Sequence, residues 1–349
     1  MAGVSVTTVS LYLHGKTSVC STATASRIKD AVKTLHYNPT PLVGSKLERE
    51  QRSVGLLAGT DIERGNPLWV VYNMRFVKGI FQVANAQDYC VINYPFSVSL
   101  KAEYRTVLDG RVDGILFYGS CNDPLVELIS KAGMPVVCFG SPIRGGIAVG
   151  NVHIDEFGLI ETAMRHLARL GHTKVAFFNG PFEDCPSTWV DEEGDRVEVF
   201  RAEPVSKVRL EAFIQMAEQR DLYLPEMVTG PHAWRGPVVA PEVDRLLSLA
   251  TRPTAIMCAN DYIARAVLKE LEGRGISVPQ EISVIGIDNI DGLSEAGRIT
   301  SVDIDVEEVG RQAMDAMVDY LLNGESGHLS RVVPAGKLIV RSTTGPALV

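Results

Sequence analysis

The sequence predicts an α/β body built from two doubly wound parallel sheets, preceded by a small all-α head. From about residue 53 onwards, short and nearly continuous apolar runs alternate with amphipathic segments, as in parallel strands covered on both faces by helices. Before them lie two short stretches with helical spacing of apolar residues. At 349 residues, the chain is long enough for more than one domain.

The head is expected to contain two short helices. The first, residues 6–13, begins after Ser5, whose hydroxyl is placed to cap it. A Ser/Thr-rich stretch precedes the second, residues 23–35, in which apolar residues recur at helical spacing. The segment 37–41, "YNPTP", then ends the helix, because each proline lacks an amide donor and restricts the residue before it.

The body alternates strands and helices along its whole length, which predicts right-handed crossovers and, given its size, two lobes. Strands are expected at residues 53–59, 90–93, 112–119, 134–140, 174–180, 254–259 and 282–288. Helices are expected at residues 72–87, 121–132, 156–170, 206–220, 241–250, 261–274 and 306–323. Residues 42–52 form a charged linker.

Charge is distributed unevenly between head and body. Residues 1–52 carry seven basic and three acidic residues, whereas residues 53–349 carry 27 basic and 39 acidic ones. A basic head on an acidic body is typical of a nucleic-acid contact, with a solvated basic face as the alternative.

Several protein classes find no support in the sequence. No apolar run approaches the roughly 18 residues that span a bilayer, and the N-terminus lacks the pattern of an export signal. The six cysteines are scattered, which favours reduced thiols in the cytoplasm over a disulfide or zinc framework. Motifs of hydrolases, zinc proteases and dinucleotide-binding enzymes are absent, so we expect no catalysis, no cofactor and no metal.

Five stretches together resemble the lactose/galactose repressor (LacI/GalR) family. They are "AGVSVTTVSLYLHG" with "TATASRIKDAVKTLHYNPT", "RVDGILFYG", "HLARLGHTKVAFFNGP", "PTAIMCANDYIARAVLKELEGRGISVPQEISVIGIDN" and "ITSVDIDVEEVGRQA", in the order that this family shows. The resemblance implies a helix-turn-helix head and a two-lobed body, similar to periplasmic sugar-binding proteins, that closes over a small ligand. The implied division is a partial helix-turn-helix at 1–40, a hinge at 41–52, and an effector-binding and dimerisation body at 53–349, with an N-lobe at 53–155 and 291–317 and a C-lobe at 156–290 and 318–349.

Family members carry a further short helix before the A-G-V-S turn. Here only Met1 precedes Ala2 and Gly3, so the first helix of the helix-turn-helix is missing. We expect a native reading frame that begins further upstream; a defective head is the alternative.

The same resemblance implies which head residues contact DNA. Leu11 stands where the family often has an arginine that reaches a guanine, which predicts a different operator or weaker binding. In the hinge, either Lys46 or Leu47 occupies the position of the residue that wedges into the minor groove. The implied base-facing residues are Val6, Thr7 and Leu11, and the implied backbone-contact residues are Ser5, Ser10, Lys16 and Arg27.

Effector-binding residues are implied in the body. Hydroxyl-rich ligands are held by carboxylates, amides and arginine, with an aromatic face against their C–H side. The candidates are Arg209 as the ligand clamp, Asn260, Asp261 and Asp288 at strand ends, Trp234 as the aromatic, and Asp155, Trp69 and Asn66 as weaker candidates. As alternatives, Arg209 is a surface charge, Asp261 and Asp288 are helix caps, and Trp234 is core.

Two further features complete the sequence-based interpretation. His172 in "LGHTKV" is expected to be a structural turn residue. The acidic insert at 181–206 is either a flap over the effector site or a peripheral hairpin.

The predicted function is regulation of transcription, as a repressor. Its partners would be a near-palindromic operator DNA, a second copy of the chain in a homodimer, and a sugar or related metabolite that changes operator affinity allosterically. The protein would act in the cytoplasm without a membrane partner. The alternative is a solute-binding or sugar-binding protein that does not bind DNA because its head is incomplete.

Overall fold

The computed structural model describes most of the chain, which forms two compact units, residues 1–50 and residues 51–349. The described residues are 3–13, 16–34, 52–57, 67–94, 107–119, 121, 123–140, 149–180, 187–190, 196–199, 204–220, 222, 224–230, 232, 238–290, 297–324 and 329–348.

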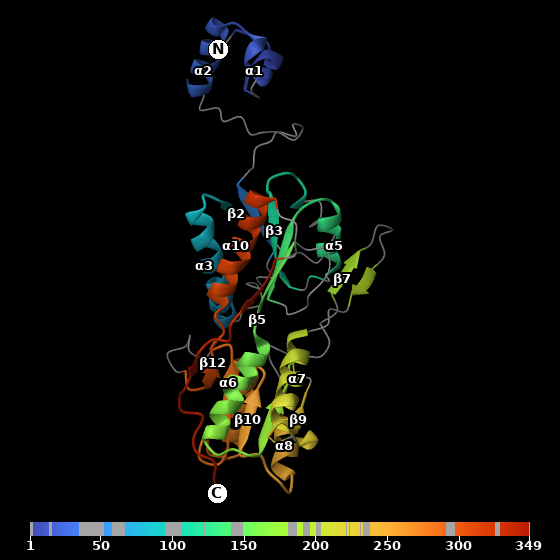
Figure 1. The fold of residues 1–349 in the computed structure, drawn as a ribbon, viewed down its shortest axis with the longest axis vertical. Helices are drawn as coiled ribbons and strands as arrows, with labels where there is room; N and C mark the ends of the chain where they lie inside the picture. The colour runs from blue at the N-terminus through green and yellow to red at the C-terminus, as the bar shows by residue number, and fades with distance from the viewer. Residues whose placement is uncertain are drawn as a thin grey trace. The chain divides into compact units, whose positions relative to one another are not determined.

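The head contains helices α1 (Val6–Leu13) and α2 (Thr22–Thr34), joined through the 3₁₀ turn η1 (Thr17–Val19) (Figure 1). Ser5 Oγ accepts a hydrogen bond from the Thr8 amide at 3.1 Å, which caps α1 as the sequence predicts. Ser21 Oγ accepts from the Thr24 amide at 3.3 Å and caps α2 in the same way. Ile28 is 1% exposed and forms the core of the head. Both predicted helices are thus confirmed, to within one residue.

The first sheet of the body has six parallel strands. In spatial order they are β13 (Leu329–Val333), β5 (Gly150–Ile154), β4 (Val136–Gly140), β3 (Gly114–Gly119), β1 (Ser53–Leu57) and β2 (Cys90–Asn93). Helices α3 (Pro67–Ala86) and α10 (Val306–Asn323) lie side by side on one face, and α5 (Pro124–Lys131) covers the other (Figure 1). Sheet and helices together are called the first lobe.

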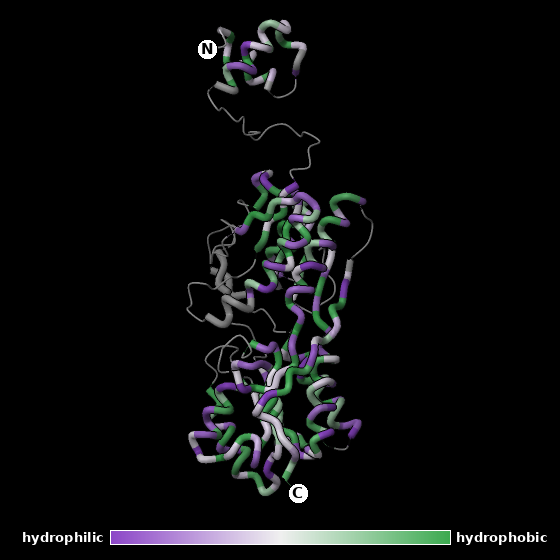
Figure 2. Tube along the Cα trace, turned by 90° about the vertical axis from the view of Figure 1, so that its left-hand side faces the viewer, coloured by the Kyte–Doolittle hydropathy of each residue, from purple (hydrophilic) through white to green (hydrophobic). Residues whose placement is uncertain are grey.

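The first four residues of β3 are all buried, and their side chains alternate between the two faces of the sheet. Leu116 packs in the cluster that contains Phe76 of α3, whereas Ile115 and Phe117 pack with Leu125 of α5. Successive side chains of a strand point to opposite faces, so a continuous apolar run supplies both cores. Figure 2 shows hydrophobic and hydrophilic residues alternating along the covering helices, as amphipathic packing requires.

The second sheet also has six strands, of which only the edge strand β14 is antiparallel. In spatial order they are β14 (Leu338–Ile339), β12 (Thr300–Val302), β11 (Ser283–Ile287), β10 (Ala255–Cys258), β6 (Val175–Phe178) and β9 (Val228–Thr229). With it pack α6 (Glu156–Arg169), α7 (Pro204–Glu218), α8 (Ala240–Ser248) and α9 (Asp261–Gly273); a 3₁₀ turn, η3 (Pro225–Met227), precedes β9. Sheet and helices together are called the second lobe.

His172 holds three segments of the second lobe together. Its Nδ1 lies 3.0 Å from Thr254 Oγ1, and its Nε2 lies 3.1 Å from Ser283 Oγ and 2.9 Å from the Gly345 carbonyl. His172 is 2% exposed, and desolvation lowers its pKa from the ordinary histidine value. The predicted structural role is confirmed.

The lobes divide the chain differently from the sequence-based prediction. β12 at 300–302 belongs to the second sheet, although the prediction places 291–317 in the first lobe. β13 at 329–333 belongs to the first sheet, and α10 packs against β3, β4, β5 and β13, although the prediction places 318–349 in the second lobe. The chain therefore crosses between the lobes three times, after β5, after β12 and after β13. The predicted division is wrong because β12 is only three residues long and the sequence pattern of β13 does not say which sheet it joins; only their pairing partners reveal this.

The insert at 181–206 contains an antiparallel pair, β7 (Ser187–Val190) and β8 (Arg196–Val199). Trp189 is paired in register with Val197. The insert therefore contains an antiparallel β pair, which is compatible with both alternatives, a flap over the effector site and a peripheral hairpin.

Two glycines allow α3 and α10 to approach closely. A Cβ on Gly310 would lie 2.2 Å from the Phe76 carbonyl oxygen, and one on Gly79 would lie 2.0 Å from that of Glu307. We expect Gly310→Ala to lower the free energy of unfolding by about 1–3 kcal/mol, because the helices must separate. Urea denaturation followed by circular dichroism measures this loss.

Gly273, at the end of α9, is the matched control, because a Cβ there would meet nothing within 4 Å. Gly273→Ala should leave stability unchanged or raise it by up to about 1 kcal/mol. Equal urea midpoints for the two variants would show that α3 and α10 are not tightly packed.

Candidate functional site

An arginine and two carboxylates form a buried ion cluster in the second lobe. Arg209 of α7 donates from Nε to Oε2 of Glu156 at 2.6 Å and from Nη1 to the Ala259 carbonyl at 2.5 Å. Its Nη1 also lies 3.6 Å from Oδ1 of Asp288. The side chains of Arg209 and Glu156 are 5% exposed and that of Asp288 is 10% exposed. The surface-charge alternative for Arg209 is therefore wrong.

The order of strands and helices explains why these groups meet. Ala259 and Asp288 directly follow the neighbouring parallel strands β10 and β11, whose carboxyl ends lie at the same edge of the sheet. Ligands of open α/β sheets bind at this edge. Glu156 opens α6 just after the first crossing between the lobes, and α7 supplies Arg209. Phe213, one turn beyond Arg209, stacks on Phe177 of β6 with ring centroids 4.7 Å apart, which anchors α7 on the sheet.

Asp288 combines a strained backbone with a perturbed carboxyl group. Its φ of 94° lies in the left-handed region that non-glycine residues rarely adopt. Burial raises the pKa of this carboxyl to about 7; the Arg209 guanidinium opposes the shift, and the Glu156 carboxylate adds to it. Strain and a shifted pKa at the same residue are typical of functional sites.

Three further predicted effector residues make local hydrogen bonds. Asn260 caps α9, its Oδ1 accepting from the Ile263 amide at 2.9 Å. Asp155 caps α6, its Oδ1 accepting from the Gly158 amide at 3.0 Å. These caps fix where both helices begin, at the edge of the site.

Asp261, the third predicted effector residue with a local hydrogen bond, is the first residue of α9 and packs against the second sheet. Its Oδ1 accepts a hydrogen bond from Ser301 Oγ at 2.7 Å, and the residue is 1% exposed. A Cβ on Gly286 would lie only 2.0 Å from the same oxygen, so the carboxylate packs against β11. The cap of α9 is Asn260, one residue earlier than the Asp261 alternative.

Some predicted residues cannot be placed. Trp234, Asn66, Lys46 and Leu47 lie outside the described residues. Trp69 is in the first turn of α3, where only the backbone is described.

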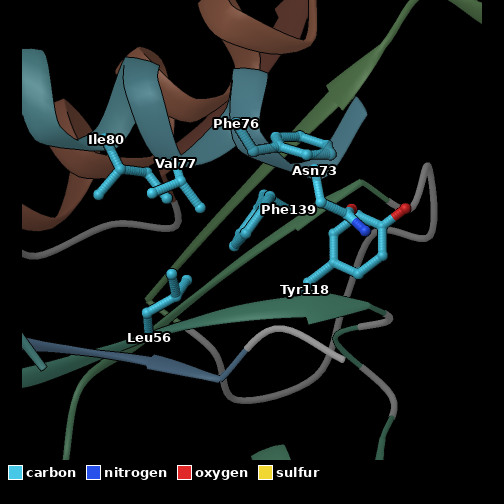
Figure 3. A pocket seen from close by; sticks show the side chains of 7 residues that line it. All are labelled: Leu56, Asn73, Phe76, Val77, Ile80, Tyr118 and Phe139. Atoms are coloured by element: carbon cyan, nitrogen blue, oxygen red, sulfur yellow. The ribbon is translucent and has the colours of Figure 1, made fainter. Parts of the chain in front are cut away.

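Aromatic side chains line a small cavity in the first lobe (Figure 3). Phe76 of α3 lies 5.3 Å from the ring centroids of both Tyr118 and Phe139, at the carboxyl ends of β3 and β4. Asn73 and Leu56 are also among its lining residues (Figure 3). The cavity holds about 10 Å³, room for one water molecule and not for a sugar.

The head presents most of its predicted DNA contacts to solvent. Val6 is 85% exposed, and Ser5, Thr7 and Ser10 are also exposed on or next to α1, while Leu11 is half-buried. Outside α1, Lys16 and Arg27 are exposed as well.

Glu156 is the member of the cluster that sequence reasoning missed. An acidic residue in the first turn of a helix is ordinary, since it complements the helix dipole. The one available signal was its position directly after Asp155, at the crossing between lobes.

Comparison with known proteins agrees with this arrangement. Residues 1–40 match the family model of bacterial regulatory proteins of the lacI family, and residues 164–344 match the periplasmic binding protein-like domain. The transcriptional repressor PurR of Vibrio vulnificus is 27% identical over 98% of this chain and 96% of its own length.

Two solved structures share the fold. The regulator CelR in complex with cellobiose has a TM-score of 0.66 and 23% identity, covering 98% of this chain and 97% of its own. The lac repressor dimer bound to operator has a TM-score of 0.69 and 18% identity, covering 99% and 96%. The chain belongs to the LacI family of bacterial regulatory proteins and is a DNA-binding transcriptional regulator with a periplasmic binding protein-like, ligand-binding domain.

Proposed function

We propose that this regulator binds a small hydroxyl-rich effector, a sugar or related metabolite, beside Arg209 and Asp288. The observation that carries the proposal is the buried ion cluster with its strained aspartate at the carboxyl edge of the second sheet. Guanidinium and carboxylate groups are the side chains that hold sugar hydroxyls by charge-assisted hydrogen bonds. The cellobiose held by CelR supports a sugar as the effector class.

The other predicted effector residues remain proposed contacts. Asn260 caps α9 and Asp155 caps α6 beside Glu156, and an amide and a carboxylate at these helix starts suit ligand hydroxyls. For Asp261, Trp234, Trp69 and Asn66 the proposal rests on the family resemblance.

The head is proposed to read a near-palindromic operator in the major groove. Val6 supports this, since an apolar side chain left 85% exposed at the start of a helix is suited to contact a thymine methyl group. Lys16 and Arg27 are exposed cations that suit phosphate contacts, and Lys46 or Leu47 is the proposed minor-groove wedge.

A homodimer acting as a repressor in the cytoplasm completes the proposal. Met74 and Phe81, one heptad apart on α3, are 43% and 46% exposed, which favours a covered apolar face. Effector binding and DNA binding would then change each other's affinity by the same factor.

Two variants of the full-length chain separate the two binding activities. Duplexes selected from a random library give a DNA probe for fluorescence anisotropy, and a thermal-shift panel of sugars and nucleosides identifies the effector. Arg209→Lys keeps the positive charge but loses the planar fork, so we expect it to bind DNA and lose the effector response. Lys16→Ala should keep the effector-dependent thermal shift and bind all duplexes more weakly. The slope of log affinity against log salt concentration should fall by about one, the contribution of one phosphate contact.

Failure of either half has a distinct signature. A panel that never shifts the melting temperature, or shifts that Arg209→Lys leaves unchanged, would contradict the effector site. An effector-dependent shift without DNA binding at low salt would favour the solute-binding alternative.

A further inference from the structure

Two buried polar side chains near the ion cluster have donors and acceptors without hydrogen-bond partners among the described residues. Asn179 directly follows β6 and is fully buried, yet neither its Oδ1 nor its Nδ2 has a hydrogen-bond partner in the described part of the protein. Ser206 is also fully buried, and its hydroxyl likewise has no partner among those residues. Buried polar atoms nearly always have a partner, and leaving them without one is costly.

The backbone places both residues next to the cluster. Phe178 pairs in parallel register with Cys258, so Asn179 lies opposite Ala259, whose carbonyl accepts from the Arg209 guanidinium. Adjacent strands lie about 5 Å apart. Ser206 precedes Arg209 by three residues on α7, and residues three apart share a face of a helix.

Glu156 determines which charge a ligand at this place can carry. It already accepts from Arg209 Nε at 2.6 Å with both side chains 5% exposed, so the guanidinium is neutralised inside the protein. Asp288 adds a second acidic group 3.6 Å from the same guanidinium. A phosphate or carboxylate entering here would meet an arginine whose charge Glu156 already balances, so these three groups leave no net positive charge to hold an anion, and the Glu156 carboxylate repels it.

We propose that the effector is an uncharged molecule whose hydroxyl groups complete the hydrogen bonds of Asn179 and Ser206. The inference rests on the proposed effector site and adds to it the charge class of the ligand and two contact residues. An amide offers one acceptor and two donors, and a serine hydroxyl offers both roles, so sugar or nucleoside hydroxyls match both. Glu156 excludes the phosphorylated and acidic forms of the same molecules.

Matched pairs of ligands test the charge class on the full-length chain. Thermal shift and calorimetry compare glucose with glucose 6-phosphate and gluconate, ribose with ribose 5-phosphate, and adenosine with its monophosphate. We expect an uncharged member to bind and its anionic counterpart to bind at least about tenfold more weakly. An anionic counterpart that binds as tightly, or more tightly, would overturn the inference while leaving the effector site in place.

Alanine at Asn179 and Ser206 tests the contact residues. Asn179→Ala and Ser206→Ala should each weaken binding of the uncharged ligand about tenfold, without lowering the melting temperature of the free chain. Thr343→Val is the control: Thr343 is fully buried, and its Oγ1 accepts from the Thr300 amide and donates to the Val284 carbonyl, so its loss should lower the melting temperature. Unchanged affinity in both variants, or a melting temperature lowered as in the control, would assign these groups a structural role and refute the proposal.

Inorganic phosphate tests Glu156 without any knowledge of the effector. At constant ionic strength, phosphate should not stabilise the wild-type chain beyond its general effect on proteins, whereas Glu156→Gln should gain a phosphate-dependent thermal shift. Glu161→Gln is the matched control on the same helix, because it releases the exposed Arg165, which Glu161 contacts at 2.6 Å. A phosphate-dependent thermal shift of the wild type that exceeds that of Glu161→Gln would contradict the inference. So would a Glu156→Gln variant that gains no phosphate-dependent shift. A panel without any binder would instead refute the proposed effector site itself.

Discussion

Replacing Arg209 with leucine should lower the free energy of unfolding of the body by about 3–5 kcal/mol. In the wild type, the Glu156 carboxylate is 5% exposed and lies 2.6 Å from Arg209 Nε. The substitution removes this partner and leaves the buried carboxylate unpaired with Arg209. It also removes the cation that lowers the pKa of Asp288. The expected result is a large decrease in the urea midpoint, followed by circular dichroism, together with loss of effector binding.

A surface pair provides the matched control for this prediction. Arg165 contacts Glu161 at 2.6 Å on α6, but the two side chains are 52% and 42% exposed. Arg165→Leu should therefore change stability by no more than about 0.5 kcal/mol. Adding Glu156→Leu to Arg209→Leu should recover part of the loss, because the unpaired carboxylate is then removed. If Arg209→Leu were as mild as Arg165→Leu, the cluster would not be a desolvated ion group.

In the wild-type chain, ionisation of Asp288 lowers the free energy of unfolding as pH rises from about 4 to 7. Asp288→Asn should remove this decrease. The pKa of this carboxyl is raised from 3.8 to about 7 in the folded chain, so between these values the native state holds a proton that the unfolded state has released. Its contribution to stability is therefore complete below about pH 4, falls as pH rises, and is lost above pH 7. Relative to wild type, Asp288→Asn should gain about 2–3 kcal/mol between pH 5 and pH 8.

The comparison must be made as a difference between variant and wild type. Burial lowers the pKa of His166, His172 and His232, and these groups add stability as pH rises, opposite in sign to Asp288. Subtraction removes their contribution, since the variant retains all three. Urea titrations at several pH values give the difference curve, and a flat curve would show that Asp288 ionises normally in the fold. The variant should also lose effector affinity, because an amide NH₂ group, which only donates, replaces one of the two oxygen atoms that Asp288 offers to the ligand.

Local signals in the sequence were sufficient for all nine α-helices that the structure describes and for seven of its fourteen described strands. α1 and α10 have the predicted ends because Ser5 and Asp305 cap their first turns and Gly324 ends α10 in a left-handed conformation. β5 was missed because Asn151 and His153 interrupt its apolar pattern, although both are buried in the sheet. For β12 and β13, the sheet to which each belongs depends on contacts between residues far apart in the chain.

The candidate site divides in the same way between local and long-range information. Arg209 and Asp288 could be named from motifs, and the structure brings them within 3.6 Å of each other. The part played by Glu156 depends on Arg209, which lies 53 residues away along the chain. Asn179 has no side-chain hydrogen-bond partner among the residues that the structure describes, and this depends on its surroundings, which no pattern in the sequence reports.

The three crossings between the lobes limit how the body can respond to a ligand. Two domains joined by one linker can rotate relative to each other in any direction. Three connecting segments restrict that rotation, so the lobes move mainly by hinge bending about one common axis. A protease that cut one of these connections would leave the halves attached through the other two. Such a nicked protein would stay in one piece on a sizing column under native conditions and come apart only after denaturation.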